Sequence, residues 1–226
     1  MLPAQPARVV ATALVLLCSV AAVVAPSACA AEAVVTVADQ EGRPVANAVV
    51  MLEPAGGQGV GAWQAPPAVM RQQGVLFDPF VLPVRAGTTV SFPNLDDIRH
   101  HVYSFSPARR FELRLYGKDE TKTEVFDKAG VVALGCNIHD NMLSYILVTA
   151  HPVYAVTDDA GVARFAGLPA GAWATYTWHP DLAGDRGERA GPPLELAEAD
   201  SRELAVAVDL RASRRAQRSP REGAYH

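Results

Sequence analysis

An all-β fold is predicted by three features of the sequence. Apolar residues at helical spacing are nearly absent, and short runs of alternating apolar and polar residues take their place. Residues 111–116 are the clearest case, because Phe111, Leu113 and Leu115 share one side of the expected strand. Gly, Pro, Asn and Asp interrupt the chain between these runs at short intervals. Many short strands separated by turns are typical of a sandwich or barrel, so we expect an all-β sandwich.

The other strands are expected in order along the chain. Alternation is again clear in 204–210, where Leu or Val stands at every second position. Further strands are expected at 34–38, 47–53, 67–72, 80–84, 88–92, 101–105, 123–126, 131–135, 143–149, 153–156, 162–166 and 173–178.

The first thirty residues, 1–30, are interpreted as a signal peptide. Arg8 is the only charged residue of this segment, and the apolar run 9–25 follows it. Ala28 and Ala30 then form an A-x-A cleavage signal. We therefore expect cleavage after Ala30 and a periplasmic or secreted protein without a membrane span.

Cleavage would leave one cysteine, because Cys18 and Cys29 lie in the removed segment and only Cys136 follows it. A single cysteine cannot form an internal disulfide. In an oxidising compartment such a thiol is either a small buried hydrophobic group or a ligand. An uncleaved membrane anchor and lipidation at Cys29 are the alternatives to cleavage.

The overall composition is that of an ordinary soluble domain. Half of the residues are hydrophobic and the formal net charge is -4, which argues against nucleic-acid binding. Only 211–226 is basic, with five arginines, and this segment is expected to be a disordered tail. No G-x-S-x-G, Walker or H-E-x-x-H pattern is present, so no enzyme is expected.

The strongest chemical signal is a C-x2-H-x2-M motif formed by Cys136, His139 and Met142. It lies between two apolar strands, and His100 and His101 stand on an expected strand upstream. Each residue alone would more often be a core or turn residue. Together they favour copper, because a thiolate, two imidazoles and a weak thioether suit both of its oxidation states. Zinc usually takes four strong ligands. The expected ligands are His100, Cys136, His139 and Met142, with His101 as the alternative to His100.

The sequence around these residues resembles the cupredoxins, the type 1 copper proteins that include plastocyanin, azurin and amicyanin. Residues 77–79 and 84–94 are similar to the family's F-x-P and V-x-x-G-x-x-V-x-F-x-N pattern. The H-H-V of 100–102 is similar to its H-N-V, and 126–130 resembles its F-x-x-x-G turn. The resemblance covers 67–149, and the whole chain is similar to cupredoxin-like proteins of the methylamine utilization group.

The resemblance implies a Greek-key β-sandwich that holds one type 1 copper ion. His100 and His139 would be the equatorial imidazoles, Cys136 the thiolate and Met142 the axial ligand. His101 stands where the family usually has Asn, which leaves open which of the two adjacent histidines binds. The implied function is to carry single electrons to and from an unidentified redox protein.

The flanks resemble the first and last strands of carboxypeptidase regulatory-like domains, which are small Ig-like or prealbumin-like sandwiches. The shared features are D-x-x-G turns and one G-L-P-x-G turn, within 35–50 and 157–171. We therefore expect a nested layout in which strands 34–38 and 162–166 share a sheet. The expected parts are the Ig-like portion at 31–66 and 151–210, and the cupredoxin domain at 67–150.

Two alternatives to an electron carrier remain. One is a protein that holds or delivers copper without redox turnover. The other is an exported Ig-like structural or binding module with a degenerate site. In each case we expect a monomer that binds no nucleic acid.

Overall fold

The computed structural model describes residues 30–57, 59–61, 63–184 and 187–212. Within these residues the regular structure is β, apart from one 3-10 turn at Ala55–Gly57, so the all-β prediction is confirmed. None of the helical structure in the described part is long and apolar enough to cross a membrane. Residues 1–29 of the predicted signal peptide (1–30) and residues 213–226 of the predicted tail (211–226) lie outside the described residues.

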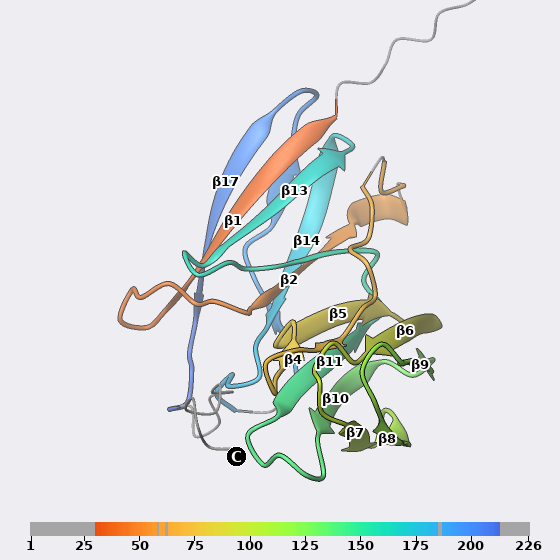
Figure 1. Ribbon diagram of the computed structural model, residues 1–226. Helices are drawn as coiled ribbons and strands as arrows, with labels where there is room; N and C mark the ends of the chain where they lie inside the picture. The colour runs from red at the N-terminus through yellow and green to blue at the C-terminus, as the bar shows by residue number, and fades with distance from the viewer. Residues whose placement is uncertain (1–29, 58, 62, 185–186, 213–226) are drawn as a thin grey trace, which may run out of the picture.

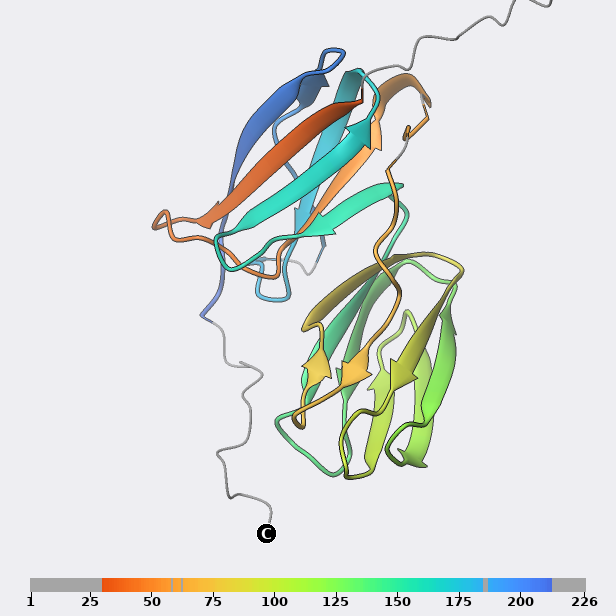
Figure 2. The same cartoon turned by 45° about the horizontal axis from the view of Figure 1, so that its top comes forward.

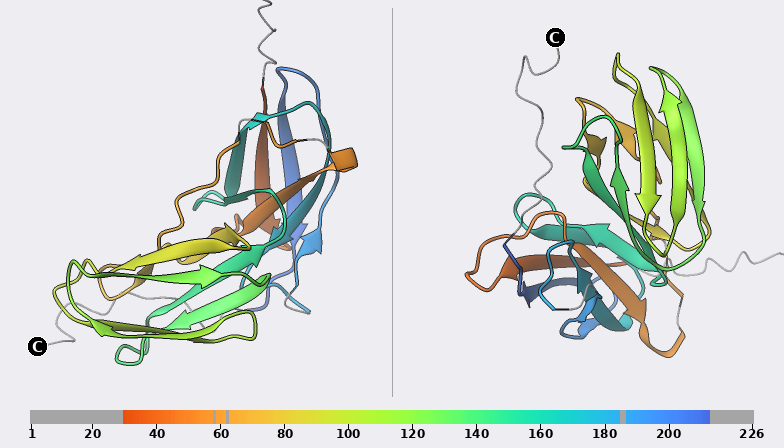
Figure 3. Two further views of the ribbon diagram at one scale, coloured as in Figure 1. Left: turned by 90° about the vertical axis from the view of Figure 1, so that its right-hand side faces the viewer. Right: turned by 90° about the horizontal axis from the view of Figure 1, so that it is seen from below.

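The strands form two sandwiches that lie next to each other (Figure 1). The two stay separate when the molecule is seen from the side and from below (Figure 3). The first is built from the two ends of the described chain and the second from the middle (Figure 2).

The first sandwich has one sheet with the strand order β13-β1-β17 and a facing sheet with the order β12-β2-β14-β15. An extra strand, β16, pairs with β14. The first sheet contains β1 (Ala31–Asp39), β13 (Val162–Leu168) and β17 (Ser201–Val208). The facing sheet contains β2 (Val49–Pro54), β12 (Val153–Val156), β14 (Gly171–Trp178), β15 (Arg189–Ala190) and β16 (Leu194–Leu196).

The two flanks of the sequence meet in this sandwich. β1 runs antiparallel to β13, with Val35 opposite Ala163, and parallel to β17. The predicted pairing of 34–38 with 162–166 is therefore confirmed. Alternate residues of β1 are fully buried, because successive side chains of a strand point to opposite faces.

Two turns with the same D-x-x-G sequence stand at neighbouring strand ends. The Asp39 side chain accepts hydrogen bonds from the backbone N–H groups two and four residues on, and Asp158 does the same. Gly42 and Gly161 end the two turns with φ of 76° and 74°. A left-handed backbone favours glycine, so the turn chemistry accounts for both motifs.

These glycines provide a matched pair of substitutions. Gly42→Ala is expected to lower the free energy of unfolding by about 1 kcal/mol, the cost of a left-handed alanine. An ideal Cβ at Gly42 meets nothing within 4 Å, whereas one at Gly161 lies 2.5 Å from the Val37 carbonyl oxygen. Gly161→Ala is therefore expected to cost about 3 kcal/mol. Urea unfolding of both variants measures the difference, and equal losses would contradict this account of the turn.

The second sandwich has a five-stranded sheet with the order β5-β11-β10-β7-β8, in which β5 and β11 are parallel. Its strands are β5 (Val81–Arg85), β7 (His100–Phe105), β8 (Arg110–Tyr116), β10 (Gly130–Gly135) and β11 (Leu143–Thr149). The facing layer contains β3 (Arg71–Gln72), β4 (Phe77–Asp78), β6 (Thr88–Pro93) and β9 (Thr121–Phe126). Isolated bridges join Val69 to Ser91 and Gln72 to Asn94, which places β3 alongside β6.

The predicted strand 67–72 is reduced to the two residues of β3. Pro66 and Pro67 precede it and have no N–H to donate to a ladder. The short strands β4, β15 and β16 were not predicted, because two or three residues are too few for alternation to be visible.

Aromatic rings connect the two sandwiches. Tyr145 of β11 packs edge-on against Phe80, with ring centroids 5.7 Å apart. It also packs against Trp178 of β14, with centroids 6.2 Å apart. Because Tyr145 and Trp178 belong to different sandwiches, their contact is part of an apolar junction between the two.

Candidate metal centre

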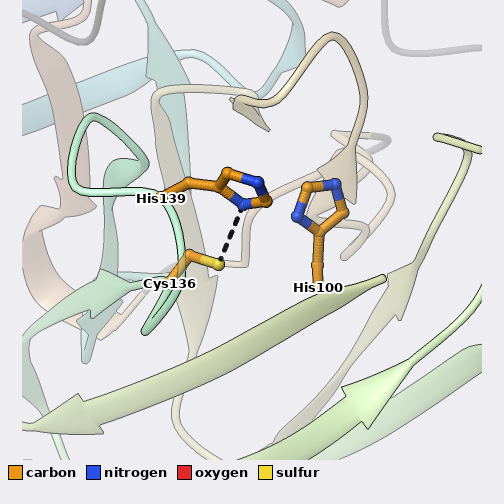
Figure 4. Close-up of side chains that lie close together, drawn as sticks. All are labelled: His100, Cys136 and His139. Carbon is orange, nitrogen blue, oxygen red and sulfur yellow. Dashed lines mark hydrogen bonds between the residues drawn. The ribbon is translucent and has the colours of Figure 1, made fainter. Parts of the chain in front are cut away.

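Three buried side chains converge at one end of the second sandwich. His100 begins β7, Cys136 directly follows β10, and His139 lies in the loop that leads to β11. Their exposed fractions are 0%, 5% and 6%, and one potential ligand atom of each lies within 4.8 Å of the others. Figure 4 shows His100 approaching from a different segment than Cys136 and His139. This is the one such group of His, Cys, Asp or Glu found among the described residues.

The loop of residues 136–142 is held at both ends by the β10–β11 ladder, whose last pair is Gly135 and Leu143. Inside the loop, the Met142 N–H donates a hydrogen bond to the His139 carbonyl oxygen at 3.0 Å. The Cys136 Sγ lies 3.5 Å from the His139 Nδ1 (Figure 4). A short loop between two paired strands therefore fixes the sulfur and one imidazole relative to each other.

His100 is held by a carboxylate on the side away from the loop. Its Nε2 lies 2.8 Å from Asp96 Oδ2, and Asp96 also accepts the backbone N–H groups of Gly74 and Val75. These bonds connect the imidazole to the turn between β3 and β4. Nothing in the sequence indicated this role for Asp96 beyond its position four residues before a histidine.

The other ring nitrogen of His100, Nδ1, is buried and makes no hydrogen bond. It is the nitrogen that is turned toward Cys136 and His139 (Figure 4). A buried polar atom without a partner normally costs about 1–3 kcal/mol. A metal ion bound between the three side chains would satisfy this nitrogen, so the residues present fit such an ion.

His101 lies on the opposite face of β7. Its Nε2 is 2.9 Å from Glu112 Oε1, and its ring packs on Tyr103 with centroids 5.8 Å apart. The structure thus brings His100, and not His101, together with Cys136 and His139. The backbone of His101 still contributes, because it helps to lower the pKa of the Cys136 thiol.

At Cys136 and His139 the surroundings lower the pKa, which favours the deprotonated forms that bind metal. Burial raises the pKa of the Cys136 thiol, but the nearby His100 imidazole and the backbone of His101 and Ile138 outweigh it, so the pKa is lowered. Burial, followed by the nearby His100, lowers the pKa of His139. Thiolate and neutral imidazole are the forms that coordinate metals.

The pKa of His100 shifts the other way. Burial lowers it, but the Cys136 sulfur and the Asp96 carboxylate raise it by more. Without a metal, a positive His100 can therefore stabilise the thiolate of Cys136.

Met142 is buried in the same core cluster as Cys136. It lies three residues beyond His139, at the end of the loop that carries both. A thioether is a soft, weak ligand that complements a plane of two imidazoles and a thiolate. No fourth His, Cys, Asp or Glu of the described residues joins the group, as a closed zinc site would require.

The strand order of the second sandwich, and the loop of residues 136–142 between β10 and β11, define its architecture. The middle of the chain is a cupredoxin-like β-sandwich. Among solved structures, a similar one is the copper-containing nitrite reductase of Thermus scotoductus, with 28% identity and a TM-score of 0.36. That match covers 45% of this chain but only 26% of the reductase.

Two smaller proteins match over nearly their full length. A mutant of amicyanin in its reduced Cu(I) form is 18% identical, with a TM-score of 0.35, over 39% of this chain and 92% of its own. A purple cupredoxin from Nitrosopumilus maritimus is 19% identical, with a TM-score of 0.31, over 44% of this chain and 97% of its own. No protein-family model and no curated protein matches the chain.

The Asp96 contact gives a prediction for copper binding. Asp96→Asn is expected to weaken copper affinity about 10-fold, because partners that orient a ligating histidine typically contribute this much. Competition with a copper chelator measures the change. The control is Asp97→Asn, since the neighbouring carboxylate is exposed and pairs with Lys118. Equal affinities of the two variants would contradict the positioning role of Asp96.

Proposed function

We propose that the protein binds one type 1 copper ion and carries single electrons between redox partners. The observation that supports this most strongly is the buried convergence of His100, Cys136 and His139. Met142, buried beyond His139, is the proposed weak fourth ligand. A bound copper ion would supply the one-electron chemistry by alternating between Cu(I) and Cu(II).

The protein's own residues would keep the site nearly unchanged in both oxidation states. The ladder between β10 and β11 holds Cys136 and His139, and Asp96 holds His100 from behind. A rigid set of soft and borderline ligands needs little rearrangement when the charge of the ion changes. Burial of the three side chains also keeps water from binding in their place.

The surface beside the site is suited to a protein partner. Leu95 and Ile98 flank Asp96, Ile138 precedes His139, and all three are large apolar side chains that are at least 40% exposed. Exposed apolar side chains next to a polar rim are typical of protein contacts. We propose that an unidentified redox protein docks here, close to His139.

We further propose that the protein acts as an exported, monomeric carrier in the periplasm or outside the cell. The A-x-A signal at Ala28 and Ala30 supports export. The connection to methylamine utilization rests on the sequence resemblance alone. No catalytic role is proposed for any residue of the chain.

Spectroelectrochemistry of the copper-loaded protein tests the proposed function. We expect an intense visible Cu(II)–thiolate band that disappears on one-electron reduction and returns on oxidation. A colourless protein that binds copper stoichiometrically without reversible oxidation would instead support a copper-holding role. Failure to bind stoichiometric copper would support an Ig-like module with a degenerate site.

A further inference from the structure

Gly135, the residue directly before Cys136, lies under the ring of Tyr103. An ideal Cβ on Gly135 would stand 2.8 Å from both Cζ and Oη of Tyr103 and 3.2 Å from Cε1. Real Cβ atoms do not come so close to other atoms, so the Tyr103 ring fills the space that a side chain of residue 135 would take.

The same two residues are directly opposed in the sheet. Gly135 of β10 pairs with Tyr103 of β7 in the antiparallel ladder between these strands. β7 begins with His100, and β10 is followed immediately by Cys136. The Tyr103–Gly135 contact therefore lies between the two strands that carry these two residues of the site.

Neighbouring rings lie on both sides of Tyr103 along β7. The His101 ring lies at 5.8 Å and the Phe105 ring at 5.1 Å, each tilted by 46°. His101 is itself fixed by Glu112 at 2.9 Å. The Phe105 ring is 76% exposed, so Tyr103 is held by the buried His101 ring on one side and by the backbone of β10 beneath it.

We propose that Tyr103 is a positioning residue of the metal site. Its ring, seated on the bare backbone of Gly135, sets the spacing of β7 and β10 and therefore the separation of the His100 imidazole and the Cys136 sulfur. It also covers the Cys136 end of β10 on the outer face of the sheet. This inference rests on the proposed copper site, but it concerns the geometry of the protein before any metal binds.

The test compares four variants with the parent in two measurements. The variants are Tyr103→Leu, Tyr103→Phe, Gly135→Ala and the double variant that combines Gly135→Ala with Tyr103→Leu. The first measurement is the rate at which a thiol reagent labels Cys136 in the copper-free protein. The second is copper affinity, together with the visible and paramagnetic-resonance spectra of the loaded protein.

We expect Tyr103→Leu and Gly135→Ala to speed labelling and to weaken copper affinity, each about 10-fold, and to shift both spectra. Tyr103→Phe keeps the ring and is expected to stay within about twofold of the parent. The double variant is expected to lie closer to the parent than Gly135→Ala alone, because the added methyl then occupies the vacated space. Phe105→Leu is the control, since it removes the adjacent ring, which is 76% exposed.

The proposal is overturned if Tyr103→Leu leaves labelling and spectra unchanged, or if Phe105→Leu changes them equally. If Tyr103→Leu does not fold, Gly135→Ala decides the question. A folded Gly135→Ala protein with the labelling rate, copper affinity and spectra of the parent overturns the proposal. A parent protein that binds no copper would reject the proposed function instead. The labelling rates of the copper-free variants would still decide the role of Tyr103.

Discussion

Replacement of Cys136 by serine is expected to abolish the intense visible band of the copper-loaded protein. A hydroxyl replaces the one thiolate that can transfer charge to Cu(II), and Cys136 is the only cysteine of the described residues. Copper affinity is expected to fall by more than about 100-fold, since loss of an outer partner alone costs about 10–100-fold. Absorption spectroscopy and chelator competition measure the two effects.

Met142→Leu is the matched control for this substitution. Leucine keeps most of the buried volume, and the thioether is expected to be the weakest ligand. The variant should therefore retain the visible band, although its position and the reduction potential should shift. A Cys136→Ser protein that kept the band would show that another group binds the copper.

The second large effect is expected from a comparison of the two adjacent histidines. His100→Ala removes an imidazole that faces Cys136 and His139, so loss of the visible band and more than about 100-fold weaker copper binding are expected. His101→Ala removes a ring on the other face of β7, so the visible band should remain. Chelator competition and absorption spectra of the two variants measure the difference.

Both histidines are buried, so far-ultraviolet circular dichroism is needed to show that each variant is folded. Loss of the band in His101→Ala with retention in His100→Ala would reverse the assignment. Equal loss in two folded variants would show that the backbone of β7, rather than one imidazole, controls the site.

Strand alternation made much of this fold predictable from the sequence. In β7 the residues His100, Val102 and Ser104 all face inward, whereas Tyr103 and Phe105 face outward. A period of two therefore separates the two neighbouring histidines without any knowledge of the tertiary structure. The spacing of Cys136, His139 and Met142 likewise placed them in one loop between two apolar strands.

The contacts that support the site could not be predicted in this way. Asp96 binds the backbone of Gly74 and Val75, and Tyr103 covers Gly135. Each contact joins residues more than twenty positions apart, so it depends on how the strands pack rather than on local pattern. Local turn chemistry also accounts for the D-x-x-G motifs by itself. The flanks are united by strand pairing instead, in which β1 pairs with β13 and β17, and β2 pairs with β12 and β14. The domain boundaries near residues 66 and 150 stay a prediction.

X-ray absorption of the copper-loaded protein tests the central claim most directly. The account predicts one copper ion per chain, bound by one sulfur at short distance and by two imidazole nitrogens. Copper surrounded only by oxygen and nitrogen, with no short sulfur contact, would contradict it.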